Sequence, residues 1–215
     1  MMPLSTLSPE QTLNRSLGIL AATAGVSIAN IYYNQPLLVS IGASFPHQLA
    51  WVGAVPAATQ FGFAIGMLLI APLGDRVNRR ALIIWQALGA CGALLVAIAA
   101  PTLAVLIGAS FMLGFFSTMA QQAGPFAAEL VPASGRGRAI GLVMSGLLLG
   151  ILLARVAAGF IGEHLGWRAV FGIAILAVSG MAALVFRYLP NSQPTSSLAY
   201  GGLIASLWRL VRELP

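Results

Sequence analysis

The chain has 215 residues, of which 59% are apolar and only 7% are charged. Soluble domains carry about 25% charged residues, and the mean hydropathy here is +0.91, so the composition does not suit a cytosolic enzyme. The net charge of +6 comes from arginines scattered between apolar runs, which argues against a nucleic-acid partner. At about 20 residues per transmembrane helix, the length has room for six spans in a lipid bilayer.

Six apolar segments of about 18 residues or more follow one another along the chain. Their continuous apolar character predicts helices, because a spanning helix satisfies its own backbone hydrogen bonds. The predicted organisation is an N-terminal cytoplasmic segment 1–15, a six-helix bundle over 16–189, and a cytoplasmic linker with an amphipathic helix over 190–215. The six predicted spans are residues 16–39, 51–73, 81–100, 103–128, 139–161 and 169–188.

The arginines divide unevenly between the two sides of this predicted bundle. When the loops are assigned to alternate sides, nine of the eleven basic residues lie on the side of the N-terminus and only Arg168 lies on the other. Cytoplasmic loops carry the excess of basic residues. Both termini are therefore expected to be cytoplasmic, in a bacterial inner membrane.

Spans 1–3 resemble spans 4–6 at a constant offset of 88 residues. Because each copy has an odd number of spans, the second copy enters the membrane from the opposite face. Inverted three-helix repeats are an architecture of secondary transporters, in which a central site opens to alternate sides. The matched residues are Gly74 with Gly162, Asp75 with Glu163, Arg80 with Arg168, Ala81 with Ala169, Gly62 with Gly150, Tyr33 with Gln121 and Asn34 with Gln122.

The loop between spans 2 and 3 reads APLGDRVNRRAL over residues 71–82. It resembles the signature of the major facilitator superfamily, G-x-L-a-D-R-x-G-R-R/K, with Ala71 and Asn78 in place of its two glycines. The resemblance implies an all-α membrane fold of two six-helix bundles. This chain would be the N-terminal bundle, formed by two inverted three-helix repeats, and a second six-helix half is the expected partner.

Span 5 partly resembles a second pattern, G-x8-G-x3-G-P-x2-G-G, of the drug–proton antiporters of this superfamily. Gly141, Gly150 and Gly159 match its glycines, whereas Ala154-Arg155 replaces Gly-Pro. Small residues let helices approach closely, so these three glycines are predicted packing positions. Ser110 stands where the family carries an arginine associated with proton coupling. The segment 29–38, ANIYYNQPLL, is also similar to the drug-efflux branch.

The charges of the 71–82 loop suggest a conformational clamp formed by Asp75, Arg76, Arg79 and Arg80. In the family, the counterpart of Asp75 meets a helix end in the second bundle, where the helix dipole favours a carboxylate. Glu129, at the end of span 4, is placed to pair with Arg76 or Arg80. The alternative interpretation is that these arginines only set the membrane orientation.

Several polar residues fall inside the spans. Arg155 is the most costly, at about 2.5–3.5 kcal/mol for an arginine at a span centre. It is predicted to hold an anionic group of a substrate, to pair with an acid of the second half, or to reach the outer surface. Asn30, Tyr33 and Gln60 lie at similar depths, so a common cavity or separate interhelical hydrogen bonds would explain them. Gln121 and Gln122 lie nearer the cytoplasm and complete the set of substrate or coupling candidates.

The function implied is a secondary active transporter, or its N-terminal half, that exports small molecules by alternating access with proton coupling. The sequence has no phosphate-binding glycine loop, metal-ligand cluster or catalytic constellation, so neither an enzyme nor a cofactor is expected. The alternative is a truncated, non-transporting remnant or a membrane scaffold or regulatory subunit.

Overall fold

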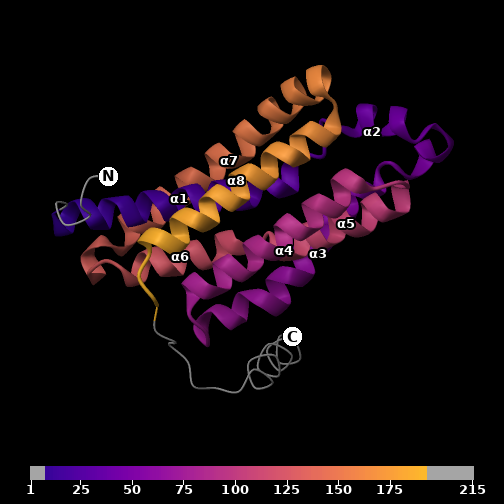
Figure 1. The fold of residues 1–215 in the computed structure, drawn as a ribbon. Helices are drawn as coiled ribbons and strands as arrows, with labels where there is room; N and C mark the ends of the chain where they lie inside the picture. The colour runs from indigo at the N-terminus through magenta and orange to yellow at the C-terminus, as the bar shows by residue number, and fades with distance from the viewer. Residues whose placement is uncertain (1–7, 193–215) are drawn as a thin grey trace, which may run out of the picture.

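The computed structural model describes residues 8–192, and within them all regular structure is helical. The amphipathic helix predicted over 203–214 lies outside the described residues. Figure 1 shows a bundle in which α1 begins and α8 ends at the same end. The helices are α1 (Pro9–Tyr32), α2 (Leu38–Ser44), the 3₁₀ helix η1 (Pro46–Trp51), α3 (Ala54–Ile70), η2 (Ala71–Asp75), α4 (Arg79–Ala99), α5 (Leu103–Phe116), α6 (Met119–Glu129), η3 (Ala133–Gly135), α7 (Arg136–Leu165) and α8 (Trp167–Tyr188).

Five segments of the described chain are long and apolar enough to cross a membrane. Helix α1 is as long, at 24 residues, but its inner face is more polar because Ser16, Thr23, Ser27 and Asn30 are buried there. The five segments are Pro46–Asp75, Arg79–Ala99, Leu103–Glu129, Ala133–Leu165 and Trp167–Tyr188.

The first and fourth predicted spans differ from the structure at their ends and centre. The first helix begins at Pro9, after the Ser8 capping box, and ends at Tyr32 rather than continuing to residue 39. Pro36 explains this end, because proline cannot donate a helical hydrogen bond and disfavours helical backbone in the residue before it. The fourth span is two helices, α5 and α6, which meet at Ser117 and Thr118.

The helices form two packed layers that follow the inverted repeat. Helices α1, α7 and α8 form one layer and α3, α4 and α5 the other, with α4 packed on α8 between them (Figure 1). Helix α1 packs on α7 as α5 packs on α3, and each of these pairs joins a first span of one copy to a second span of the other. The packing thus has the twofold pattern predicted from the repeated sequence.

The hydrogen bonds at the two ends of the bundle repeat this symmetry. An Nη2 of Arg80 donates to the carbonyl oxygen of Phe186, near the end of α8. The Nε of Arg168 donates to the carbonyl oxygen of Ile98, near the end of α4, at 3.1 Å. Both donors and both acceptors are separated by the predicted 88 residues. Arg80 of α4 thus caps the C-terminal end of α8, and Arg168 of α8 caps the C-terminal end of α4. At both ends the helix dipole favours a positive charge.

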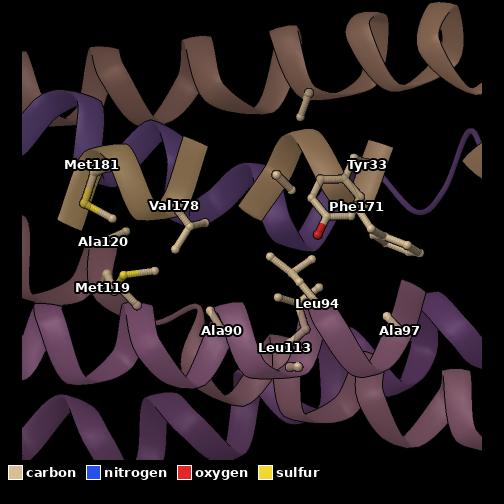
Figure 2. Close-up of a cluster of buried hydrophobic side chains, with 14 of the residues drawn as sticks. Tyr33, Ala90, Leu94, Ala97, Leu113, Met119, Ala120, Phe171, Val178 and Met181 are labelled. Atoms are coloured by element: carbon tan, nitrogen blue, oxygen red, sulfur yellow. The ribbon is translucent and has the colours of Figure 1, made fainter. Parts of the chain in front are cut away.

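The crossing of α4 and α8 lies on the local symmetry axis. The Sγ of Cys91 is 3.4 Å from the Oγ of Ser179, and the two residues are 88 positions apart. Around this crossing, buried side chains such as Leu94, Val178 and Met181 fill the space between the layers (Figure 2). The core is thus the contact between the two halves of the repeat.

Replacing Ser179 with cysteine should let the chain form a disulfide across this crossing. A disulfide needs two side chains that reach each other, and the Sγ of Cys91 already lies 3.4 Å from the Oγ of Ser179. Cys91 is the only cysteine of the sequence. We expect the variant to lose both reactive thiols after mild oxidation, as measured by alkylation and mass spectrometry. The matched control is Ser145→Cys on α7, which should keep both thiols. Two free thiols in the Ser179→Cys chain would contradict the crossing.

Candidate functional site

A buried arginine organises the loop between α3 and α4. The side chain of Arg79 is only 6% exposed. It donates from Nη2 to Oδ1 of Asp75 at 2.6 Å, from Nε to Oε1 of Glu129 at 2.8 Å, and from Nη1 to Oε1 of Gln122 at 3.2 Å. Gly74 makes room for this arrangement, because a Cβ there would collide with the Gln122 amide. One guanidinium thus joins the loop to α6 through three acceptors.

The backbone around this arginine is fixed by local caps. The Oδ1 of Asn78 accepts from the backbone N–H of Arg80 at 3.0 Å and of Ala81 at 3.4 Å, which satisfies the first turn of α4. The backbone N–H of Arg79 donates to the Oγ of Ser192 at 2.7 Å. The segment that follows α8 therefore holds the start of α4 in place.

The pairing of Glu129 differs from the sequence prediction. Glu129 pairs with Arg79, not with Arg76 or Arg80. Arg80 instead reaches the end of α8, where its Nη1 donates to Oδ1 of Asn191 at 3.2 Å. Arg76 directly follows η2 and is half-buried. The reason is geometric, because Arg79 is the arginine in the first turn of α4 whose side chain faces α6.

The break between α5 and α6 is held by polar side chains of α1. The Oγ of Ser27 donates to the carbonyl oxygen of Ser117 at 2.8 Å and accepts from the backbone N–H of Ala120 at 3.2 Å. The Nδ2 of Asn30 donates to the Oγ of Ser117 at 3.1 Å. All of these groups are buried. Backbone that leaves the helix within a membrane needs such partners, so α1 and the broken span form one polar centre.

The Ser27 and Ser117 contacts were missed at the sequence level. The signal that could have found them is the pairing of small polar residues in the first spans of the two copies, close to one repeat length apart. A second polar link joins Thr118 to α4, because Nε2 of the buried Gln86 donates to its Oγ1 at 2.6 Å. The break is therefore tied to spans of both layers.

The predicted substrate and coupling candidates do not share one cavity. Asn30 and Tyr33 line a pocket of 530 Å³ between α1, α7 and α8. Gln60 and Arg155 are exposed and do not line it, and Gln121 is half-buried on α6. Of these candidates, this pocket therefore brings together only Asn30 and Tyr33 among the described residues. Gln122, the remaining candidate, belongs to the Arg79 cluster.

The pocket is almost entirely apolar. Alanine, glycine and leucine residues of α1 and α7 form most of its wall. Tyr33 is packed edge-on against Phe171, with ring centroids 5.4 Å apart. Its hydroxyl is buried and finds no hydrogen-bond acceptor among residues 8–192.

Arg155 contacts an aromatic ring of α1. Its guanidinium carbon lies 5.1 Å from the ring centroid of Tyr32, a distance typical of a cation–π interaction. In the part of the chain that the structure describes, acidic residues lie at helix ends or in the loop, at Glu10, Asp75, Glu129 and Glu163. Arg155 is thus a charge within a span that packs on an aromatic ring.

One of the three predicted packing glycines lies at a close helix crossing. A Cβ on Gly150 would collide with the backbone of Gly25, and one on Gly25 would come within 2.8 Å of the carbonyl oxygen of Gly146. A Cβ on Gly141 or Gly159 would meet no described atom within 4 Å. Nine residues are about two and a half helical turns, so these two glycines lie on the side of α7 opposite to Gly150. Within residues 8–192, the close crossing of α1 and α7 thus involves Gly150 and Gly146, which sequence reasoning missed, and not Gly141 or Gly159.

A glycine-mediated crossing of the same kind occurs in the other layer. A Cβ on Gly62 of α3 would collide with the carbonyl oxygen of Phe111, and one on Gly114 of α5 with that of Thr59. The two copies of the repeat therefore join through equivalent tight crossings of helices.

A helical bundle of two inverted copies, with a broken helix at its centre and a charge cluster at one end, defines half of a secondary-transporter fold. The comparison with protein families agrees, because the model of the Major Facilitator Superfamily matches residues 15–215. The chain belongs to that superfamily.

Similar proteins confirm the fold and the extent of the match. The uncharacterized transporter YgaY of Escherichia coli O157:H7 is 38% identical over 94% of this chain and 52% of its own length. The multidrug efflux pump LfrA of Mycolicibacterium smegmatis is 31% identical over 62% of this chain and 27% of its own. A crystal structure of a D-xylose–proton symporter matches with a TM-score of 0.70 at 16% identity, over 93% of this chain and 53% of that chain. The chain thus spans about half the length of YgaY.

Proposed function

We propose that this chain is one half of a secondary active transporter that exports a small molecule by alternating access. The observation that carries the proposal is the Arg79 cluster, in which one guanidinium joins the loop between α3 and α4 to α6. Such a cluster at one end of the bundle can stabilise one of the two conformations of alternating access, in which the central site opens to one side of the membrane or to the other. Export is favoured because relatives such as LfrA are described as efflux pumps.

Asp75 is the proposed conformational contact of the cluster. Its side chain is 53% exposed although its Oδ1 accepts from Arg79, so it can face a second half while it remains oriented by the arginine. Glu129, at 28% exposure, is the more enclosed acid. We therefore assign contact with the second half to Asp75 and orientation of Arg79 to Glu129.

Replacing Asp75 with asparagine should strongly reduce transport by the assembled transporter while leaving membrane insertion intact. The substitution keeps the shape of the side chain and removes the charge that a helix end of the second half would bind. Efflux of a fluorescent substrate and the amount of membrane-inserted protein are the two measurements. Glu10→Gln, on the first turn of α1, is the matched control. Wild-type transport by the Asp75→Asn variant would contradict the clamp.

We also propose that the proton-binding carboxylate of the assembled transporter lies in the second half. The acidic residues of the described spans lie at helix ends, and Arg155 is the charged residue within a span. Arg155 is then available to an anionic substrate group or to an acid of the second half. Transport by an Arg155→Gln variant separates these roles. Loss of transport of anionic substrates alone indicates that Arg155 binds the substrate, whereas loss of all transport indicates that it pairs with an acid of the second half.

The proposed orientation has both termini in the cytoplasm of a bacterial inner membrane. It is supported by Arg15 in the first half of α1, Arg79 and Arg136 at the starts of α4 and α7, and Arg187 at the end of α8. Reporter enzymes fused to the N-terminus and to the loop between α7 and α8 test it. Activity of a periplasmic reporter at the N-terminus would overturn the orientation.

A further inference from the structure

Two arginines share one aromatic ring where α1 begins and α8 ends. The guanidinium carbon of Arg15 lies 4.3 Å from the ring centroid of Tyr188, and that of Arg187 lies 5.5 Å from the same centroid. Both positive charges therefore lie beside one ring, although they come from opposite ends of the described chain. We call these three residues the arginine–tyrosine site.

The charge of this site is not neutralised by an ion pair within the described residues, where both salt bridges belong to Arg79. The Nε of Arg15 is also enclosed and lacks a hydrogen-bond acceptor among residues 8–192. An enclosed N–H of a charged group is costly without an acceptor. The site therefore favours a ligand that brings negative oxygen atoms.

The surroundings indicate where such a ligand would come from. Phe186 and Leu184, on the last turns of α8, are exposed apolar side chains, and tyrosines at span ends typically mark the membrane–water interface. A pocket of 360 Å³ beside the ring is lined by Tyr188, by Thr12 and Ser16 of α1, and otherwise by leucine and proline side chains. An acyl chain can follow the apolar surface of α8 while a small polar headgroup lies at the pocket.

We propose that the arginine–tyrosine site binds the phosphate of an anionic phospholipid. Arg15 and Arg187 donate to the phosphate oxygen atoms, as guanidinium groups commonly do, and Tyr188 holds both side chains in place. An anionic lipid is selected over a zwitterionic one because neither arginine forms an ion pair with an acidic residue in the described part of the chain. By bridging α1 and α8, the lipid ties the first span of the bundle to the last.

The test uses the purified full chain in detergent. Retention of dioleoyl phosphatidylglycerol and of dioleoyl phosphatidylcholine is compared by native mass spectrometry and by the thermal shift that each lipid produces. We expect phosphatidylglycerol to bind the wild-type chain more tightly. In the Arg15→Gln/Arg187→Gln variant its affinity should fall about 30-fold, the effect of two basic residues at a charged membrane surface. The matched control, Arg136→Gln/Arg138→Gln, removes two exposed arginines from the start of α7 and should retain the lipid.

Three results would overturn the proposal. Equal binding of the two lipids by the wild-type chain would remove the charge selection. An equal loss in the Arg136→Gln/Arg138→Gln control would indicate a general effect of positive charge. Stabilisation by inorganic phosphate or glycerol phosphate as large as that by phosphatidylglycerol would indicate a free-anion site instead of a lipid site. If the double glutamine variant does not fold, the single variants Arg15→Gln and Arg187→Gln replace it, each with a smaller expected loss of affinity, and the lipid selectivity of the wild-type chain remains a decisive measurement.

Discussion

Replacing Arg79 with glutamine should destabilise the bundle more than any other single change in the loop between α3 and α4. The variant leaves Asp75, Glu129 and Gln122 without their shared donor. Breaking a fully buried pair costs about 3–5 kcal/mol. Because Asp75 is 53% exposed and Glu129 is 28% exposed, water screens part of this loss, and we expect about 2 kcal/mol. Thermal unfolding of the chain in detergent measures it.

The control for this prediction is Arg76→Gln, which removes a half-buried arginine of the same loop. It should change stability by less than about 0.5 kcal/mol, as substitutions away from such networks do. A double-mutant cycle with Glu129→Gln should also show coupling between positions 79 and 129, since residues within one network are not additive. Equal losses for Arg76→Gln and Arg79→Gln, with no coupling, would refute the central role of Arg79.

The second large effect is expected at Gly150, where replacement with valine should separate α7 from α1. A Cβ at this position collides with the backbone of Gly25, and backbone cannot move aside as a side chain can. Overpacking a tight contact costs about 1–3 kcal/mol or more, and here it affects the helix pair that joins the two copies. We expect a loss of at least 3 kcal/mol, near the top of that range, and little folded protein.

Gly159→Val is the matched control for Gly150→Val, because it makes the same change on the same helix where no described atom lies within 4 Å of the new Cβ. The chain alone should tolerate it. The yield of monodisperse protein in size-exclusion chromatography compares the two variants. Similar yields of Gly150→Val and Gly159→Val would show that α1 and α7 can separate enough to admit a side chain at position 150.

The parts of the fold that depend on composition and repetition could be predicted from the sequence. Long apolar runs need helices in a membrane, and each predicted span contains a helix, although α1 begins earlier and ends earlier than predicted and the fourth span is broken into α5 and α6. The offset of 88 residues, seen first as matched residue types, recurs as the contact of Cys91 with Ser179. The repeat seen in the sequence therefore also predicts which helices contact each other.

The parts that depend on side-chain direction could not be predicted. The three arginines of the loop carry the same charge, so the sequence does not show which of them pairs with Glu129. The folded loop buries Arg79 against Glu129, and this makes Arg79 the partner. Gln122 looked like a residue of the substrate path, yet it completes the coordination of that arginine. The break between α5 and α6, at Ser117 and Thr118, has no proline or glycine that would predict a helix end. It depends on hydrogen bonds from α1.

The central claim, that this chain is half of an exporter, is tested most directly by transport. Accumulation of a fluorescent lipophilic dye is measured in cells that produce the chain alone, the chain with a second six-helix half, or the latter pair with Asp75→Asn. If the chain is half of a proton-coupled exporter, dye accumulation should be low only for the wild-type pair, and a protonophore should restore it. Equal accumulation in all three strains, with membrane-inserted protein verified in each, would contradict it.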